Sequence, residues 1–354
     1  MASLKVGVVL FQLGGPDSVE AIEPFLYNLF SDPDIIDFPF ARVARQPLAR
    51  LIAARRAAHV AHHYAAIGGR SPIREFTERQ AVALERELRE RGVDARVTIA
   101  MRYSNPLTAA AVAEVEQWKP EELVLLPLYP QYSKTTTGSA FNEWNRRFRP
   151  QGRRPRIHRI EDYHDEPAYL ESVCALIDQW AARIPDPEQV DMVFSAHSVP
   201  QAVIDSGDPY QRQVERTVEL VCRLGGWPVR RHICYQSKVG ASKWLRPSLD
   251  ETIKKLAGAR HVLVVPISFV SDHVETLFEI DIEQREQARA LGIRDFHMVA
   301  GLNDTPKFVA ALAGLVEAQL ATPRGAPRDR TAAPPAPDPG LRERTRAAAP
   351  ARRS

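Results

Sequence analysis

The segment HVLVVPISFVSDHVETLFEIDIE, residues 261–283, decides the fold. It begins with ten mostly apolar residues, typical of a buried strand, and continues after residues 271–273 with a helical pattern. In that helix Glu275, Glu279 and Glu283 recur every four residues, so they share one face of an α-helix. On this row alone an ordinary solvated surface is the favoured interpretation, and a site that handles cations or protons is the alternative.

Apolar runs and helical patterns alternate along the whole chain, which predicts βαβ units and an α/β fold with parallel sheets. The predicted strands are residues 5–11, 95–101, 123–128, 191–196, 231–235, 261–269 and 296–300. The predicted helices are residues 18–30, 47–66, 75–91, 106–118, 167–183, 209–224, 249–256, 274–291 and 306–320. Two groups of strands, separated near the Pro/Arg-rich residues 146–156, indicate two similar halves.

Three helix starts carry recognisable signals. Asp17 with Glu20 and Ser248 with Glu251 have the spacing of a capping box. Pro306 suits the first turn of the helix that it opens.

The charge distribution argues against a nucleic-acid partner. The chain has 47 basic and 44 acidic side chains, a net charge of +3. Residues 322–354 contain eight Arg against three acidic residues, together with seven Pro among mostly Ala and Arg, so we expect a disordered tail. The remainder is nearly neutral and lacks interleaved basic and aromatic residues.

Several further features predict a cytoplasmic protein. The N-terminus runs straight into a strand without a leader pattern, and no apolar run reaches the about 20 residues of a membrane span. The three cysteines, Cys174, Cys222 and Cys234, are odd in number and lack CxxC spacing, which favours reduced thiols over disulfides or zinc ligands.

Polar residues follow nearly every predicted strand, at the edge where ligands bind in parallel sheets. His197 ends one strand, and His273 and Glu275 follow another. A lone histidine is more often structural, but histidine and carboxylate together suit a divalent transition ion. The same pair could instead remove protons near neutral pH. We expect a large polar and aromatic cleft between two lobes here.

Other motifs are weaker. The LGGP segment at residues 13–16 lacks the third glycine of a dinucleotide fingerprint, so a tight turn explains it better than nucleotide binding. Trp244 could equally line a pocket or fill a core. The apolar residues 32–40 are by default a core contact, and alternatively an exposed lip over a flat hydrophobic ligand or a bilayer surface.

Taken together, these segments make the chain resemble the ferrochelatases, which insert Fe²⁺ into a porphyrin. The resemblance covers residues 6–320 and rests on the motifs LGGP (13–16), IGGRSPI (67–73), LPLYPQYS (126–133), FSAHSVP (194–200), GDPY (207–210), QSKVG (236–240) and FVSDHVETLFE (269–279). It implies a chelatase-like fold of two Rossmann-like lobes with parallel four-stranded sheets flanked by helices and a cleft between them. We assign residues 1–130 to the first lobe, joined by helix 305–321, residues 131–304 to the second, and residues 322–354 to the tail.

The resemblance also implies the site residues. His197 and Glu275 match the catalytic and metal-binding pair, with Glu275 opposite the histidine across the macrocycle. Glu279 and Glu283 match an acidic row leading from the site. Asp272 and His273 match its supporting shell. The expected porphyrin contacts are Leu13, Phe30, Arg56, Tyr64 and Ser71, with Tyr132 and Trp244 added as pocket candidates and the loop 35–40 as a lip.

In the expected mechanism a neutral His197 accepts a proton, while Glu275 and the acidic row carry charge away. Protoporphyrin IX and Fe²⁺ are the expected substrates. The rivals are coproporphyrin III, another tetrapyrrole chelatase, or a non-catalytic porphyrin or haem carrier. Leu13 favours protoporphyrin IX, because enzymes that use coproporphyrin III often have Tyr there.

Two departures from the family pattern matter. Lys134 stands where cluster-bearing members have a cysteine, and the tail contains none, so no [2Fe–2S] cluster and no tightly bound cofactor are expected. Arg70 replaces a common glycine, which leaves the local propionate contacts open. Peripheral membrane contact is possible, and the oligomeric state is not predicted.

Overall fold

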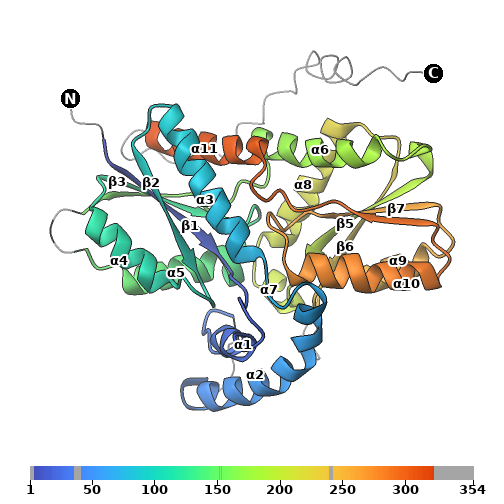
Figure 1. The fold of residues 1–354 in the computed structure, drawn as a ribbon, viewed down its shortest axis with the longest axis horizontal. Coiled ribbons are helices and arrows are strands. Elements are labelled where there is room, and N and C mark those ends of the chain that lie inside the picture. The colour runs from blue at the N-terminus through green and yellow to red at the C-terminus, as the bar shows by residue number, and fades with distance from the viewer. Residues whose placement is uncertain (1–3, 36–40, 151, 153, 239–241, 323–354) are drawn as a thin grey trace. The chain divides into compact units, whose positions relative to one another are not determined.

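The computed structural model describes residues 4–35, 41–150, 152, 154–238 and 242–322. Two parallel four-stranded sheets organise this part of the chain (Figure 1). The first has the order β2-β1-β3-β4 and comprises β1 (Val6–Gln12), β2 (Ala95–Met101), β3 (Glu122–Pro127) and β4 (Arg156–Arg159). The second has the order β6-β5-β7-β8 and comprises β5 (Val190–His197), β6 (Arg230–Gln236), β7 (His261–Pro266) and β8 (Asp295–Met298). The predicted fold class is confirmed, and the cleft between the lobes stays a prediction.

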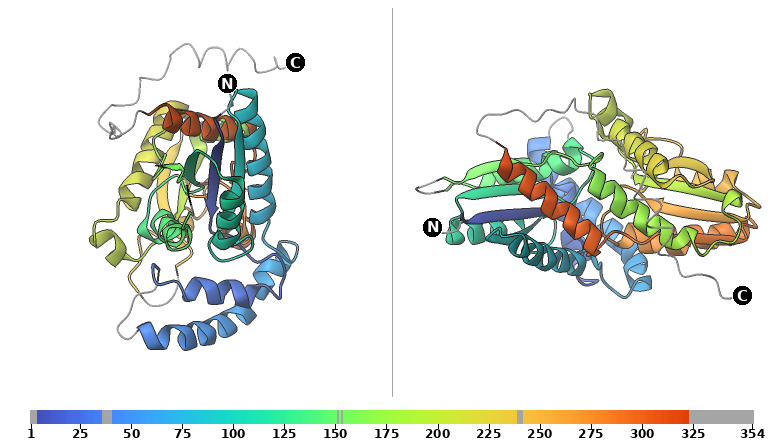
Figure 2. Two further views of the ribbon diagram at one scale, coloured as in Figure 1. Left: turned by 90° about the vertical axis from the view of Figure 1, so that its left-hand side faces the viewer. Right: turned by 90° about the horizontal axis from the view of Figure 1, so that it is seen from above.

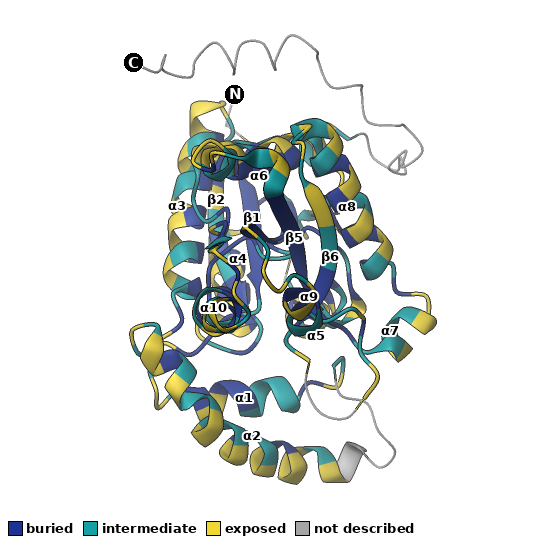
Figure 3. Ribbon diagram, turned by 90° about the vertical axis from the view of Figure 1, so that its right-hand side faces the viewer, coloured by how far each residue is buried: buried dark blue, intermediate teal, exposed yellow. Residues whose placement is uncertain are grey.

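Helices cover both sheets, which explains why the central strands are mostly apolar. All seven residues of β1 and all six of β7 are buried, and β1 is dark in Figure 3. The α-helices are α1 (Ile22–Phe30), α2 (Ala41–Ala66), α3 (Ile73–Glu90), α4 (Thr108–Trp118), α5 (Ser139–Arg147), α6 (Pro167–Ala181), α7 (Gln201–Asp205), α8 (Tyr210–Gly225), α9 (Leu249–Lys255), α10 (Arg285–Ala290) and α11 (Pro306–Ala321). The other helical segments are η1 (Lys134–Gly138), η2 (Pro187–Gln189) and η3 (Glu275–Gln284).

The predicted lobe boundary at residue 130 is too early. Strand β4 pairs with β3 in the first sheet, and the buried Trp144 of α5 packs against Phe11 of β1. The sequence did not indicate β4 because it is a four-residue edge strand, Arg-Ile-His-Arg, without an apolar run. Helix α11 packs on α3 and α6 and thereby joins the two halves. The tail from residue 323 onward lies outside the described residues.

Two of the three predicted helix-start signals are confirmed. Ser248 and Glu251 form a reciprocal capping box at the start of α9. Pro306 occupies the first turn of α11. The third prediction is wrong: α1 begins only at Ile22, and the hydroxyl of Ser18 rather than a carboxylate accepts a hydrogen bond from the Ala21 amide.

The segment predicted as one α-helix over residues 274–291 is instead a π-helix, η3, followed by the short α10. A π-helix has hydrogen bonds from residue i to i+5 and about 4.4 residues per turn, so residues four apart still lie on nearly the same face. Such segments are frequent at functional sites. The wider turn therefore keeps Glu275 and Glu279 together on one side.

Helices α1 and α2 lie side by side beyond the carboxyl ends of β1 and β2 (Figures 1 and 2). They share an apolar cluster that contains Ile22, Phe25 and Tyr64 and against which Leu13 and Val274 pack. This cluster therefore joins the end of β1 to the residue that directly precedes η3. Among the described residues, no helix is long and apolar enough to span a membrane.

Candidate active site at the ends of β5 and β7

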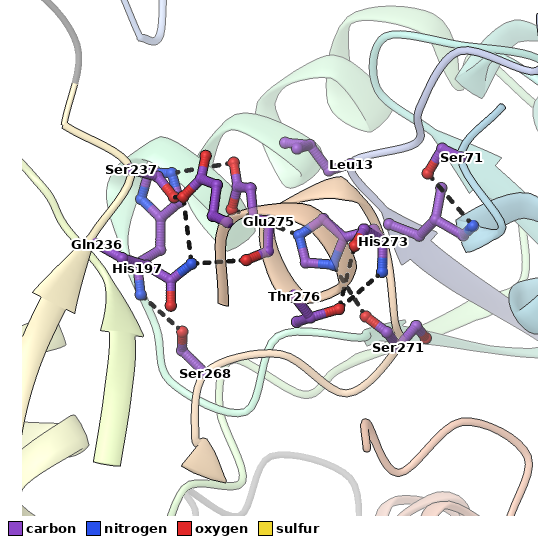
Figure 4. A network of polar contacts seen from close by, with 12 residues as sticks. Leu13, Ser71, His197, Gln236, Ser237, Ser268, Ser271, His273, Glu275 and Thr276 are labelled. Atoms are coloured by element: carbon purple, nitrogen blue, oxygen red, sulfur yellow. Dashed lines mark hydrogen bonds and ion pairs between the residues drawn. The ribbon is translucent and has the colours of Figure 1, made fainter. Parts of the chain in front are cut away.

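The centre of the site is a contact between His197 and Glu275. His197 is the last residue of β5, and Glu275 begins η3 after the neighbouring strand β7. Their Nε2 and Oε1 atoms are 3.5 Å apart (Figure 4). The expectation that a macrocycle lies between them is wrong, because two groups this close leave no room for one. Both belong to the second lobe and can approach a ligand only from the same side.

His197 and His273 both turn their Nε2 atoms toward Glu275. The Nδ1 atom of His197 lies 2.5 Å from the carbonyl oxygen of Ser198, and that of His273 lies 3.1 Å from the carbonyl oxygen of Ser271. The Nε2 atom of His273 is 3.4 Å from Glu275 Oε2. Metal-binding histidines usually donate the other ring N–H to a carbonyl in this way. The arrangement can therefore offer imidazole nitrogen and carboxylate oxygen to one cation.

Electrostatics make the central contact an ion pair. Burial alone would lower the pKa of His197, but the charge and hydrogen bonding of Glu275 raise it to about 9. Burial likewise opposes ionisation of Glu275, yet the charge of His197 and hydrogen bonds from both histidines hold its pKa well below the usual range. These opposite shifts favour an ion pair, with a proton on His197 and a negative charge on Glu275, before any metal binds. The raised pKa opposes the expectation of a neutral His197 near pH 7.

Glu279 differs chemically from Glu275. Burial and the nearby charge of Glu275 raise the pKa of Glu279 to about 7. Its Oε2 accepts hydrogen bonds from Ser237 Oγ at 2.5 Å and from Gln236 Nε2 at 3.3 Å. Glu279 can thus accept or release a proton near neutral pH. Glu283, the third carboxylate of the row, is exposed to solvent.

Gln236 is a site residue to which the sequence gave no role. Its amide nitrogen donates to the carbonyl oxygen of Glu275 at 2.8 Å, and its Oε1 accepts from Ser195 at 2.6 Å. Tyr210 contributes similarly, because its hydroxyl donates to the carbonyl oxygen of His197 at 2.9 Å. The position of Gln236 could have indicated its role, because Gln236 and His197 are the paired last residues of neighbouring strands.

Asp272 fixes the turn that delivers His273 and Glu275. Its buried carboxylate accepts hydrogen bonds from the Gly301 amide at 3.0 Å, Asn303 Nδ2 at 2.8 Å and Thr276 Oγ1 at 3.1 Å. These bonds engage both oxygens, so Asp272 acts on the segment that follows it rather than as an available ligand.

Four of the predicted porphyrin contacts gather around the α1–α2 cluster. Leu13, Phe30 and Tyr64 pack there, and the Arg56 guanidinium lies 5.9 Å from the centre of the Phe30 ring. Burial raises the pKa of Tyr64, and the charges of Glu275 and Glu279 raise it further, which places Tyr64 within electrostatic reach of both carboxylates.

Among the described residues, no hydrogen bond, ion pair or ring contact joins the remaining three candidates to the histidine–glutamate pair. Ser71 is buried beside Gly15, where a methyl group on that glycine would meet the serine side chain at 2.7 Å. Tyr132 donates its backbone N–H to Gln213 at 2.6 Å. Trp244 pairs with Pro200, three residues after His197, and its indole N–H is buried without a hydrogen-bond partner in the described part of the chain.

A parallel two-sheet α/β fold with a histidine–carboxylate pair at its strand ends is an arrangement that suits a metal chelatase. The fold is similar to that of SirB from Bacillus subtilis, solved with Fe³⁺, with a TM-score of 0.51 and 11% identity over 90% of this chain and 96% of that one. The ferrochelatase family model matches residues 5–320, and the chain belongs to the ferrochelatase family.

Several ferrochelatases are much more similar to this chain in sequence than SirB is. A ferrochelatase of Aquifex aeolicus is 46% identical over 90% of this chain and 100% of the relative. A ferrochelatase of Geotalea uraniireducens is also 46% identical, over 88% of this chain and 97% of the relative. The protein is therefore a chelatase enzyme of the lyase class that inserts iron into a porphyrin, a step of haem biosynthesis.

Proposed function

We propose that the porphyrin substrate is protoporphyrin IX and that His197 and Glu275 perform the insertion of Fe²⁺. The observation that carries the assignment of the pair is its geometry, an Nε2–Oε1 distance of 3.5 Å at the ends of adjacent strands. Iron is the substrate metal in this scheme. His197 and Glu275 bind it from one side of the macrocycle.

The pKa values of His197 and Glu279 indicate where the protons released during iron insertion go. Insertion of Fe²⁺ releases the two pyrrole N–H protons of the porphyrin, and binding of iron to the His197 imidazole releases the proton held there. Glu279, with its pKa near neutrality and its Oε2 held by Ser237, passes protons that leave the pair on toward solvent and does not retain them. The exposed Glu283 then provides the outward end of the row.

The preference for protoporphyrin IX is supported by the lining beside the pair. The α1–α2 cluster is apolar, and Leu13 packs against it. Protoporphyrin IX carries vinyl groups where coproporphyrin III carries further propionates, so it loses less hydration against such a surface. Arg56 suits one of its propionates, because the guanidinium Nε is buried without a hydrogen-bond partner among the described residues.

The test is anaerobic insertion of Fe²⁺ into each porphyrin, followed by absorbance and compared as kcat/KM. The proposal expects protoporphyrin IX to be favoured, and Leu13→Tyr to narrow the difference. A higher kcat/KM for coproporphyrin III with the unmodified chain would refute the assignment. His197→Ala should abolish insertion with porphyrin binding retained, and near-normal turnover would remove His197 from the chemistry.

We further propose that activity needs no [2Fe–2S] cluster and no tightly bound cofactor. An all-cysteine cluster requires four thiolates, and this chain has three cysteines. Lys134 occupies η1 with its ammonium group at the Ser206 hydroxyl. Acid-labile sulfide in purified active protein would contradict the proposal. A cytoplasmic location and peripheral membrane contact also remain predictions.

A further inference from the structure

Three histidines on α2 form a cluster outside the site described above. His59, His62 and His63 have i, i+3 and i+4 spacing, which places them on one face of the helix. The ring centres are 6.1 Å apart for His59 and His62, 6.2 Å for His59 and His63, and 4.2 Å for His62 and His63. His59 and His62 are exposed, and His63 is half-buried.

This cluster faces the helix that carries the catalytic carboxylates. The His63 ring stacks on Phe278 of η3 with centres 4.0 Å apart, and His62 meets the same ring edge-on at 5.6 Å. Phe278 directly precedes Glu279. Figure 1 shows the carboxyl-terminal end of α2 rising to the start of η3. The histidines therefore lie between solvent and the turns that bear the acidic row.

The ring spacing is compatible with a shared metal ion. Imidazole nitrogen binds Zn²⁺ at about 2.0–2.1 Å, which places two ring centres on one tetrahedral ion about 5 Å apart. The observed separations of 4.2–6.2 Å bracket that value. Two histidines at i and i+4 on a helix face form a recurrent metal-binding pair. None of the three rings forms a hydrogen bond with another described residue, so all their nitrogens are available after a side-chain rotation.

We propose that His59, His62 and His63 bind a divalent transition-metal ion and supply it to the acidic row. The binding rests on the cluster alone, whereas the supply of iron rests on the proposed function. Imidazole suits Fe²⁺, and a solvent-facing site keeps coordination positions open for water. Fe²⁺ binds nitrogen ligands more weakly than Co²⁺ or Ni²⁺, which favours its release to the stronger site inside.

Binding is tested with Co²⁺ on the untagged full chain, by calorimetry and visible absorption. His197→Ala/Glu275→Gln is the starting protein, so that the insertion site does not contribute. Adding His59→Gln and His63→Gln should weaken Co²⁺ binding by at least about tenfold. Substitution of a residue that only holds a metal ligand in place already lowers metal affinity by about that factor. Unchanged binding would overturn the proposal.

His164→Gln is the matched control. Asp162, His164 and Asp165 are the one described group of three or more such residues whose ligand atoms already lie within 4.8 Å of one another. The proposal expects this substitution to leave Co²⁺ affinity unchanged. Loss of the bound Co²⁺ in His164→Gln, with the α2 variant unaffected, would place the metal elsewhere and overturn the proposal.

The supply role is tested by kinetics in an otherwise unmodified chain. His59→Gln/His63→Gln should raise the KM for Fe²⁺ at least about threefold, with kcat at saturating iron and the KM for porphyrin unchanged, as expected for lost uniform binding. An unchanged KM for Fe²⁺ in a variant that has lost Co²⁺ binding would refute the supply role. Failure of the unmodified chain to insert iron into protoporphyrin IX would instead refute the proposed function.

Discussion

Replacing Glu275 by Gln tests the electrostatic account of the site most directly. The substitution keeps the shape of the side chain and removes the charge 3.5 Å from His197 Nε2. At an effective dielectric constant of about 20, two unit charges at that distance attract by about 5 kcal/mol. Because 38% of the His197 side chain is exposed, screening by water reduces the effect to about 2–3 kcal/mol, or about two pK units.

The assay is NMR titration of His197 in isotopically labelled protein without metal or porphyrin. In the unmodified chain the imidazole should titrate with a pKa of about 9, and in Glu275→Gln it should fall to its ordinary range or below. Glu283→Gln is the control, because it removes the same charge from an exposed position of the same helix. It should leave His197 unchanged. A titration of His197 within half a pK unit in all three proteins would refute the reasoning.

The same pair sets the pH dependence of metal binding. Below its folded pKa, His197 holds a proton that an incoming ion must displace. The apparent affinity for Fe²⁺ should therefore rise with pH between about 7 and 9 and level off above that. Co²⁺ can replace Fe²⁺ as an air-stable probe. An affinity that falls over this range would show that His197 is not the group displaced.

Three further outcomes follow from side-chain hydrogen bonds and ion pairs. The Asp32 carboxylate accepts hydrogen bonds from Tyr103 and Ser139 and pairs with Arg102. Although burial opposes ionisation, these partners lower its pKa from 3.8, so it stabilises the fold above about pH 4 and loses that effect as pH falls further. Asp32→Asn should cost about 3–5 kcal/mol at pH 7, because Arg102 loses its buried partner, and should flatten the acid limb of a denaturation–pH profile; an unaltered limb would contradict this. Ser248→Ala removes the α9 cap and should cost about 1 kcal/mol in urea denaturation, with insertion unaffected; a loss below the error of the method would show the cap to be redundant. Gln236→Leu leaves the carbonyl of Glu275 without its donor and should reduce kcat more than the KM for porphyrin, whereas equal changes would indicate a general loss of structure.

The sequence predicted the sheets well because their strands are buried on both faces. Continuous apolar runs such as residues 261–266 can be recognised without knowledge of neighbours. It failed at β4, where the alternation Arg-Ile-His-Arg reflects an edge strand, and at α5, where the apolar residues are few. Edge elements owe their conformation to the sheet that they join, and that information is not local.

The candidate site shows a similar division. His197 and Glu275 could be predicted as site residues because each lies at or just after the end of a strand. The distance between their side chains could not be predicted from their spacing along the chain. The direct contact follows from the register of β5 against β7, and the raised pKa of His197 follows from the charge of Glu275, neither of which a motif records. Gln236 was missed for the same reason, because its role consists entirely of bonds to residues about 40 positions away.

The three carboxylates of the row therefore cannot be treated as equivalent. Glu275 is ionised because two imidazoles face it, and its charge is one of the two causes that raise the pKa of Glu279. When a divalent cation binds at the pair and displaces the His197 proton, the local charge rises from about zero to about +1, which lowers the pKa of Glu279. A proton taken up by Glu279 before iron binds is then released as iron arrives. Iron binding at the pair thus causes Glu279 to release its proton. This sequence of events requires Glu279 to lie between the ion pair and solvent.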